Sequence, residues 1–431
     1  MKFTSLFLLS AAVWGQDFVL RNVNIHPVVG AEIRGGAITV VGGKITEVSA
    51  KVTPKKTDKV IDGKGLHVYP GLINCSTLLG LSEVTSVRET NDTNEIGEFI
   101  PQVRAVVAVN PDSEHIAVTR VNGITTAITL PATLTNEGGR GGAPQGLIRG
   151  QATMIHLDGW TWEDMAVQQN AGILMRFPAL TTRRAGAAEF AAPTVVPYAE
   201  AKRVYDAEIK KIEDFFESAH RYEAQKNAKS ADFSPNMVYE AMLPVFAGKV
   251  PMLIHAQNER TIREAIAFSK KQKVKIILID VQRPGKMLDE IKANNIPVIV
   301  GKTTNLPEEE DDDYDAAYSL PGQLYKSGIK FAFATYDNQF ARNLPYEAAF
   351  GVAYGLPYEA ALKALTIDAA AIFGVADQIG SLEAGKWADM IVTDGDPLEV
   401  KTQLKMLFIK GKNVTLETKQ TRLYEKYMGR Q

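Results

Sequence analysis

Cysteine is almost absent from this sequence of 431 residues, because Cys75 is its single thiol. One cysteine excludes an intrachain disulfide, so the hydrophobic core must supply the stability of the fold. Charge of one sign is missing as well, since 48 lysines and arginines nearly balance 50 aspartates and glutamates. A chain without a basic excess is not expected to bind nucleic acid or an anionic membrane surface.

Long apolar runs are missing from the rest of the chain once the first fifteen residues are passed. No later segment reaches about 18 uninterrupted apolar residues, the length that a membrane-spanning helix needs. Apolar residues make up 45% of the chain and charged residues 23%, as in an ordinary globular protein. We therefore expect a sizeable core and no membrane span.

Residues 1–15 differ in character from everything that follows. Lys2 supplies a positive charge, the stretch from Phe3 to Trp14 is mostly apolar and uncharged, and Val13 and Gly15 suit a cleavage site before Gln16. This pattern is typical of a secretory signal peptide, with a buried N-terminal strand or a retained anchor as the alternative. We predict that residues 1–15 are a signal peptide and that the protein is exported, to a periplasmic or extracellular location.

Residues 16–68 have the pattern of a small β-rich module. Short apolar or alternating runs are separated by glycine pairs such as Gly35-Gly36 and Gly42-Gly43, which favour turns. The runs that predict strands are Phe18–Val23, Ile33–Val41, Lys44–Val48 and Leu66–Tyr69.

Strand-length apolar runs alternate with helical stretches over residues 69–375, and the helical face of Arg260–Lys270 is an example. Repeated strand–helix units predict a parallel sheet, and their number favours a (β/α)8 TIM-like barrel over an open sheet. Residues 376–431 return to strands, so both chain ends are expected to form one composite β-sandwich, followed by a C-terminal tail. The strand candidates are Ile124–Leu130, Val250–His255, Ile276–Ile279, Val298–Val300 and Phe331–Ala334 in the barrel, with Ala388–Thr393 and Met406–Lys410 after it.

Two stretches resemble the amidohydrolase superfamily, most closely its imidazolonepropionase-like branch. Val68–Asn74, with the letters VYPGLIN, is similar to the entry into the first barrel strand of that family. Ala361–Thr366 and Gly380–Val392 look like its C-terminal signature, which leads from the last barrel helix into the β-sandwich. The resemblance implies metal-dependent hydrolysis of C–N bonds other than peptide bonds, with one or two divalent ions at the barrel mouth.

The resemblance also identifies candidate site residues, although the first-strand motif is altered. Where the family has Pro-Gly-x-Ile-Asp-x-His-x-His, this chain has Ser76 and Leu78 in place of both histidines. His255 matches the fifth-strand metal ligand, with a structural histidine as the alternative. Asp280 is the only candidate at the sixth strand, although a loop carboxylate that starts the next helix is the favoured interpretation. Asp337 matches the eighth-strand aspartate that acts as ligand and general base, with a cap for Asn338–Arg342 as the alternative. We predict a site for one divalent ion, with zinc as the first choice, held by His255, Asp280 and Asp337, and loss of the metal stays open as the alternative.

Several other residues complete this interpretation. Asp158 and Glu83 are candidates to reinforce the site, whereas a structural loop and solvated surface are the favoured interpretations. Arg176 stands where relatives often have a lysine, and a guanidinium cannot be carbamylated into a bridging ligand. Cys75 is expected to be a buried thiol, the run Glu308–Asp313 a solvated acidic loop or a cation site, and Trp160 and Trp162 packed side chains.

The sequence thus predicts an exported hydrolase that cleaves the C–N bond of a small amide or cyclic amide. The alternative is a non-catalytic protein of the amidohydrolase fold that binds a small ligand or partner at the barrel mouth. In both cases a small molecule is the expected ligand, and a homo-oligomer is left open.

Overall fold

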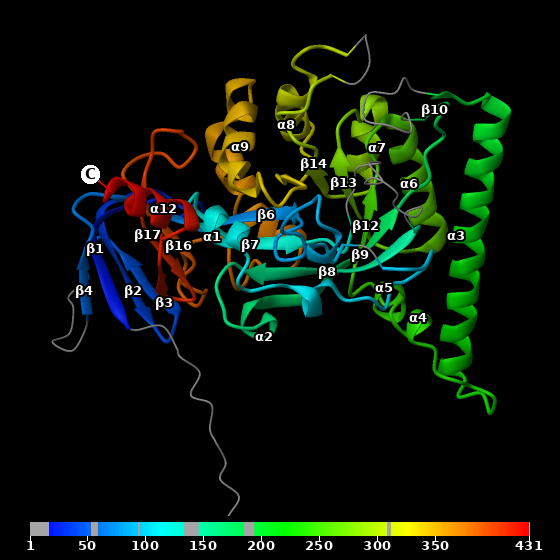
Figure 1. The fold of residues 1–431 in the computed structure, drawn as a ribbon, viewed down its shortest axis with the longest axis horizontal. Helices are drawn as coiled ribbons and strands as arrows, with labels where there is room; N and C mark the ends of the chain where they lie inside the picture. Colours follow the sequence, from blue (N-terminus) through cyan, green and yellow to red (C-terminus); the bar gives the residue numbers. More distant parts are fainter. Residues whose placement is uncertain are drawn as a thin grey trace, which may run out of the picture.

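The computed structural model describes residues 17–52, 59–93, 95–132, 146–184, 194–307 and 312–430. Within these residues the strands form two eight-stranded sheets and a two-stranded ribbon of β10 (Arg183–Arg184) and β11 (Thr194–Val195). Figure 1 shows the two eight-stranded sheets side by side, one of them made of the first and last strands of the chain. The predicted signal peptide lies outside the described residues, so export stays a prediction.

One eight-stranded sheet, which forms the β-domain, is built from both ends of the chain. Strand β16 pairs antiparallel with β5, from Met390 opposite Pro70 to Thr393 opposite His67, and so connects the two halves. Its interior is apolar, and the rings of Phe18 and Phe408 stack with centroids 4.8 Å apart. The predicted composite β-domain is confirmed; its strands are β1 (Phe18–Ile25), β2 (Ile33–Val41), β3 (Lys44–Ser49), β4 (Lys59–Asp62), β5 (His67–Pro70), β16 (Met390–Thr393), β17 (Leu404–Ile409) and β18 (Lys412–Val414).

The other eight-stranded sheet is a barrel whose strands follow one another in chain order. Two backbone hydrogen bonds close it between the first and last strands: Cys75 N donates to Phe333 O at 3.2 Å and Tyr336 N donates to Ser76 O at 2.8 Å. The predicted TIM-like barrel is therefore confirmed. Its strands are β6 (Leu72–Thr77), β7 (Ile124–Thr129), β8 (Ile148–His156), β9 (Ala166–Arg176), β12 (Met252–His255), β13 (Ile276–Val281), β14 (Val298–Val300) and β15 (Phe331–Ala332).

Strand β8 departs from the parallel pattern that the sequence predicts, since it runs antiparallel to both β7 and β9. Only residues 157–165, with the short helix α2 (Trp162–Met165), connect β8 to β9. A parallel crossover needs a dozen or more residues, so a connection of this length returns the chain as a hairpin. The packing expected of Trp160 in this connection is wrong, because Trp160 is 87% exposed, while Trp162 packs against the core.

Alternating strand residues divide the barrel core into two layers. Each of the eight strands contributes to an inner cluster that includes Ile73, Cys75, Leu253 and Ile299. Cys75 is a buried free thiol, as predicted, and burial raises its pKa far above the ordinary value, so it stays protonated. The strand residues that alternate with this inner cluster point outward and pack against the helices.

The helices cover the outside of the barrel (Figure 1). In α6 (Glu259–Gln272), Asn258 and Thr261 form a capping box, and Ile262, Ala265 and Ile266 are the buried face, as the helical pattern predicts. The others along the barrel are α1 (Glu114–Arg120), α3 (Tyr198–Asn227), α4 (Met237–Glu240), α5 (Leu243–Phe246), α7 (Leu288–Ala293), α8 (Ala316–Lys326), α9 (Leu344–Ala353), α10 (Tyr358–Ala364) and α11 (Ile367–Ile372).

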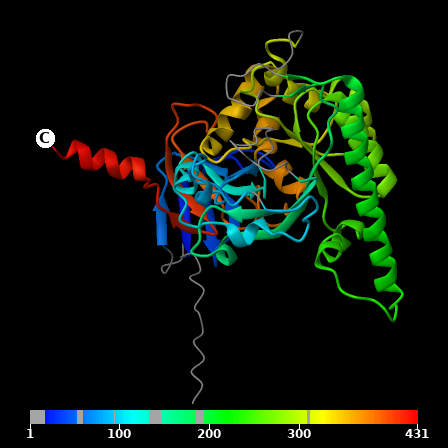
Figure 2. The same cartoon turned by 45° about the vertical axis from the view of Figure 1, so that its right-hand side comes forward.

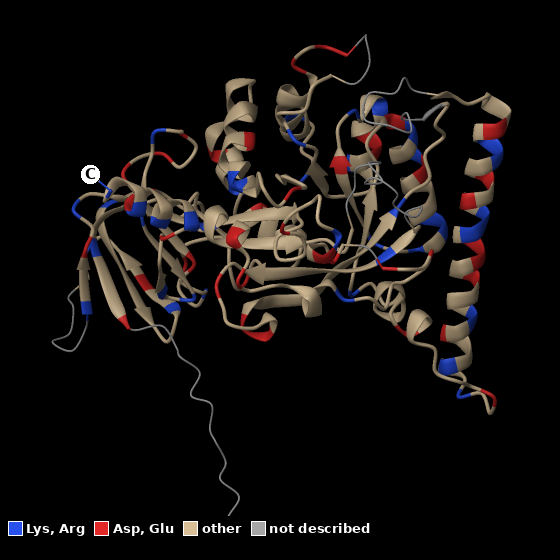
Figure 3. Ribbon diagram, in the orientation of Figure 1, with Lys and Arg blue, Asp and Glu red and all other residues tan. Residues whose placement is uncertain are grey.

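Two helices extend beyond this layer. The long helix α3 carries charges of both signs along its length (Figure 3), including the Lys202–Asp206 and Lys210–Asp214 pairs four residues apart. Helix α12 (Lys419–Met428) projects away from the body of the molecule (Figure 2). Among the described residues, no helix combines the length and the apolar character that crossing a membrane requires.

A buried side-chain pair fastens the barrel to the β-domain. His156 at the end of β8 and Asp389 just before β16 are both buried, with His156 Nε2 2.8 Å from Asp389 Oδ2. The same aspartate accepts hydrogen bonds from Lys410 N at Oδ1 and from Gly71 N at its backbone oxygen. Asp389 therefore connects three segments that are distant in sequence.

We expect Asp389→Ala to lower the free energy of unfolding by about 2–4 kcal/mol, because two buried N–H donors lose their acceptor. Asp394→Ala is the matched control: Asp394 follows β16 but is a surface residue paired with Lys405 and should change stability much less. Midpoints of chemical denaturation measure both changes. Equal effects of the two variants would contradict the role assigned to Asp389.

The β-domain also contains a pair of hydrogen-bonded histidines. His26 Nε2 lies 2.9 Å from His67 Nδ1, and the His26 ring stacks on Tyr69 at 4.2 Å. A hydrogen bond between two imidazoles requires that at least one of them is neutral. Burial lowers the pKa of His26 below its ordinary value; His67 acts in the same direction, whereas Glu32 and Asp396 oppose it.

A histidine whose pKa is lower in the folded state stabilises the fold fully above its unfolded pKa of about 6.5 and loses that contribution as the pH falls. We therefore expect the wild-type protein to lose more stability between about pH 7.5 and pH 5.5 than His26→Gln does. His220→Gln, at a half-buried position on α3 outside the β-domain, should keep the wild-type difference. Denaturation midpoints at both pH values test this, and an unchanged difference in His26→Gln would argue against it.

Candidate active site at the barrel mouth

The carboxyl ends of the barrel strands bring the predicted site residues to one end of the barrel. His255 is the last residue of β12, Asp280 lies near the end of β13, and Asp337 follows β15. Lys302 follows β14 at the same end. In TIM-like barrels this end carries the active site, since loops there can vary without disturbing the core.

His255 and Asp280 form a direct pair. His255 Nε2 is 2.9 Å from Asp280 Oδ2, and the two side chains are 11% and 12% exposed. The amide of Gln257 donates to Asp280 Oδ2 at 2.8 Å, and that of Gln282 donates to Oδ1 at 3.2 Å. The carboxylate of Asp280 thus accepts from three side chains, which hold it in one orientation.

Asp280 has an unusual backbone, and a tyrosine supports it. Asp280 and Tyr336 have φ values of 57° and 53°, in the left-handed region that is uncommon outside glycine. Asp280 N donates to the hydroxyl oxygen of Tyr336 at 2.6 Å, and this hydroxyl donates to Val300 O at 3.0 Å. Burial raises the pKa of Tyr336 far above its ordinary value, so the phenol stays neutral and remains a donor.

Asp337 has different partners. Its Oδ2 lies 3.4 Å from Lys302 Nζ, and its Oδ1 accepts from Phe340 N at 3.0 Å. Within the described part of the chain, no hydrogen bond or ion pair joins Asp337 to His255 or Asp280. The structure therefore brings together two of the three predicted ligands, and Asp337 also caps the turn that follows it.

The donor set at the mouth does not fit the metal that the amidohydrolase resemblance implies. A protein zinc site takes at least three side-chain ligands, and the described residues contain no group of three His, Cys, Asp or Glu side chains that could hold an ion. At the first-strand positions, the buried Ser76 hydroxyl has no hydrogen-bond partner, and Leu78 has no donor atom. The metal-ligand roles of His255, Asp280 and Asp337 stay predictions without a third ligand to support them.

The remaining candidates lie elsewhere or have other partners. Asp158 pairs with Arg120 at 3.2 Å and with Lys412 of β18 at 2.8 Å, at the end of the barrel that faces the β-domain. Arg176 pairs with Glu208 of α3, and Glu83 contacts Asn110. Most of the acidic run Glu308–Asp313 lies outside the described residues.

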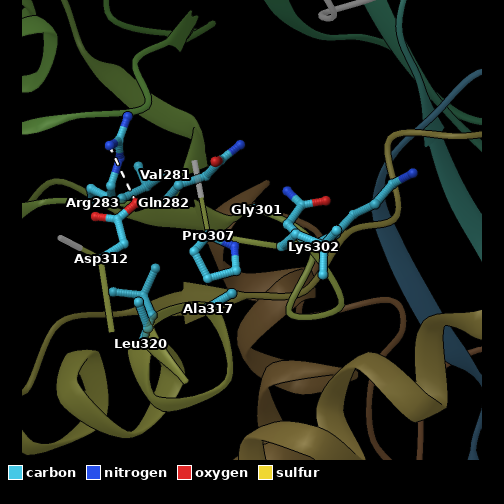
Figure 4. A pocket seen from close by; sticks show the side chains of 12 residues that line it. Val281, Gln282, Arg283, Gly301, Lys302, Pro307, Asp312, Ala317 and Leu320 are labelled. Atoms are coloured by element: carbon cyan, nitrogen blue, oxygen red, sulfur yellow. Dashed lines mark hydrogen bonds and ion pairs between the residues drawn. The ribbon is translucent and has the colours of Figure 1, made fainter. Parts of the chain in front are cut away.

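A pocket adjoins the His255–Asp280 pair, between the loops after β13 and β14 and the start of α8. Gln282 lines the pocket and also donates a hydrogen bond to Asp280, so this one residue connects the pocket to the His255–Asp280 pair. Figure 4 shows Arg283 and Asp312 paired across one side, at 3.4 Å, with Pro307 and Leu320 nearby, and Lys302 extending away from them. The half-buried carboxamide of Asn305 also lines the pocket.

Sequence reasoning missed Gln257, Gln282, Lys302 and Tyr336. Histidines and carboxylates at strand ends are the sequence signals of a metal site, and neutral amides or a phenol carry no such signal. The position of Gln257 two residues after His255 was the single cue available. The contact between Tyr336 and Asp280 joins residues 56 positions apart and depends on barrel curvature.

Comparisons with known proteins agree with this architecture. The model of the amidohydrolase family matches residues 122–414, more than half of the chain. The curated relative "Amidohydrolase tasK" of Hapsidospora irregularis is 24% identical over 403 residues, which cover 87% of this chain and 39% of the relative. The chain thus spans about two fifths of the length of the curated relative that it matches.

Solved structures show the same fold. An amidohydrolase from Thermotoga maritima MSB8 is 22% identical, with 92% of this chain and 99% of that chain covered and a TM-score of 0.79. A zinc-bound adenosine deaminase from Xanthomonas campestris is 14% identical, with 96% and 97% covered and a TM-score of 0.52. The superfamily resemblance is confirmed, whereas the imidazolonepropionase-like branch stays a prediction.

We expect Asp280→Val to lower the free energy of unfolding by about 2–5 kcal/mol, because a β-branched residue strains a left-handed backbone and the three donors lose their acceptor. Asp280→Asn is the matched variant: asparagine tolerates this backbone and keeps one acceptor oxygen, so its loss should be clearly smaller. Chemical denaturation followed by circular dichroism compares the two. Equal losses in the two variants would mean that neither the left-handed backbone at residue 280 nor the oxygen that asparagine keeps contributes to stability.

Proposed function

The chain belongs to the amidohydrolase family, a membership that supports a hydrolase, and we propose that it cleaves C–N bonds, other than peptide bonds, in a small amide or cyclic amide. The cleavage takes place at the barrel mouth, at the His255–Asp280 pair. Export, which the first fifteen residues support, is part of the same proposal. The activity of the longer curated relative enters only as support for the reaction class.

The observation that carries the proposal is the contact between His255 Nε2 and Asp280 Oδ2 at 2.9 Å. A carboxylate that accepts from one ring nitrogen fixes the orientation and tautomer of the imidazole and stabilises its protonated form. The other nitrogen, Nδ1, has no hydrogen-bond partner among the described residues and remains able to accept a proton. A partly exposed, oriented histidine has the geometry of a general base.

The reaction derived from this pair balances without a further reactant. His255 Nδ1 takes a proton from water as the water oxygen bonds to the amide carbonyl carbon. The C–N bond then breaks, and the proton held by His255 passes to the leaving nitrogen. The carboxylate of Asp280 stabilises the transient imidazolium by charge.

The adjoining pocket suits the amide part of such a substrate. Gln282 and Asn305 present carboxamides, which both donate and accept hydrogen bonds, as an amide ligand does. Pro307, Ala317 and Leu320 supply apolar surface beside them. A small amide therefore matches the carboxamides and the apolar part of the described pocket, whose lining also includes Lys302 and the Arg283–Asp312 ion pair.

A specific observation also favours a second candidate, a non-catalytic protein that binds a small ligand at the same mouth. Ser76 and Leu78 replace the two first-strand histidines of the family motif, and the donor set of the described residues falls short of a metal site. The pocket and the Gln282 contact would then serve binding alone.

Release of amine or ammonia from a panel of small acyclic and cyclic amides tests the two candidates. We expect turnover by the wild-type protein and a loss of about 10²–10⁴-fold in kcat/KM for His255→Gln, because the base is removed. His220→Gln, on α3 where the ring stacks on Phe246 of α5, should retain wild-type activity. No release above buffer, together with saturable binding of an amide by the wild-type protein, would replace the hydrolase by the binding protein.

A further inference from the structure

The strand ends of this barrel are joined by side chains at the place where a hydrolase of this fold would be expected to use a metal. We propose that Tyr336, Asp280 and His255 form a metal-independent clasp that holds the barrel mouth in its final shape. The inference concerns how the mouth is held together and does not depend on whether the chain hydrolyses amides.

The clasp reaches five strands. Tyr336 lies in the segment after β15. Its hydroxyl donates to Val300 O at the end of β14 and accepts from Asp280 N near the end of β13. Asp280 in turn holds His255 at the end of β12. The backbone of Tyr336 completes the set, because its N–H donates to Ser76 O of β6 at 2.8 Å.

The oxygen atoms that a metal would need are already used by these contacts. The Asp280 carboxylate accepts from His255, Gln257 and Gln282, so a cation at Asp280 would compete with three hydrogen-bond donors for its oxygen atoms. Asp337 is held by Lys302 and Phe340 N, so its carboxylate faces an ammonium group. A cation would thus compete with hydrogen bonds and a positive charge that are built into the fold.

The backbone conformations of Asp280 and Tyr336 indicate that the contacts of the clasp hold this part of the chain in place. Both Asp280 and Tyr336 have left-handed φ values, which persist only where the surrounding contacts over-determine them. Their mutual contact at 2.6 Å is such a constraint, because each residue holds the other at its strand end. The Tyr336 hydroxyl both accepts, from Asp280 N, and donates, toward Val300 O and Ile299 O, so it uses both of its hydrogen-bonding roles within the clasp.

The first test measures metal dependence on the wild-type protein without using activity. We expect less than about 0.1 equivalent of zinc after incubation with excess zinc and dialysis, and a thermal midpoint that chelator or added zinc changes by less than about 1 °C. About one equivalent of retained zinc, with a lower midpoint in chelator, would overturn the proposal.

The second test removes the hydroxyl alone. Tyr336→Phe keeps the aromatic ring and the same backbone demand, so it isolates the hydrogen bonds that the phenol makes with Asp280 N, Val300 O and Ile299 O. We expect the thermal midpoint to fall by about 2–8 °C, and zinc should not restore it. Tyr325→Phe on the surface of α8 is the control, with a change below about 1 °C.

An unchanged midpoint in Tyr336→Phe would remove the clasp, and recovery with zinc would show a metal site beneath it. If Tyr336→Phe does not fold, the zinc and chelator measurements on the wild-type protein still test the metal independence of the mouth, and retained zinc would still overturn the proposal. None of these readings depends on turnover, so failure of the clasp and failure of the proposed hydrolase are separate results.

Discussion

Closure of the barrel between its first and last strands is the constraint on which the candidate site depends. The two backbone hydrogen bonds that connect residues 75–76 with residues 333–336 bring together segments some 260 residues apart. Once they form, the carboxyl ends of β12, β13 and β14 must converge on the same mouth. The pairing of His255 with Asp280 and the contact of Tyr336 with Asp280 follow from that convergence, because each joins residues of different strands.

The β-domain contributes to the same closure from the other end of the barrel. Asp389 holds the end of β8, the connection from β5 to β6 and the turn before β18, so it fixes where the chain enters the first barrel strand. A buried carboxylate in this position needs all of its donors, since an unpaired one would be costly. The domain built from both chain ends is therefore part of how the barrel is positioned.

The side chains at the barrel mouth differ from the metal site that the amidohydrolase family leads one to expect, and the difference begins with two residues of the first strand. With Ser76 and Leu78 on the first strand, the surviving histidine and carboxylates are too few and too dispersed for a metal site within the described residues. Asp280 turns instead to nitrogen donors, and Asp337 turns to Lys302. The mouth thus presents an oriented histidine paired with Asp280, next to a pocket whose lining includes Gln282, the residue that donates to Asp280.

The sequence alone determined the class of fold, because apolar periodicity and glycine turns are local properties that barrel and β-domain strands must satisfy wherever they pack. It also placed His255, Asp280 and Asp337 at strand ends. Only the tertiary structure decided that the first two pair while Asp337 does not, since side-chain partners depend on barrel curvature and on two left-handed residues, which no periodicity encodes. The antiparallel direction of β8 was likewise decided by the tertiary structure. The connection from β8 to β9 is too short for a crossover, and β8 pairs with the strands on either side, β7 and β9.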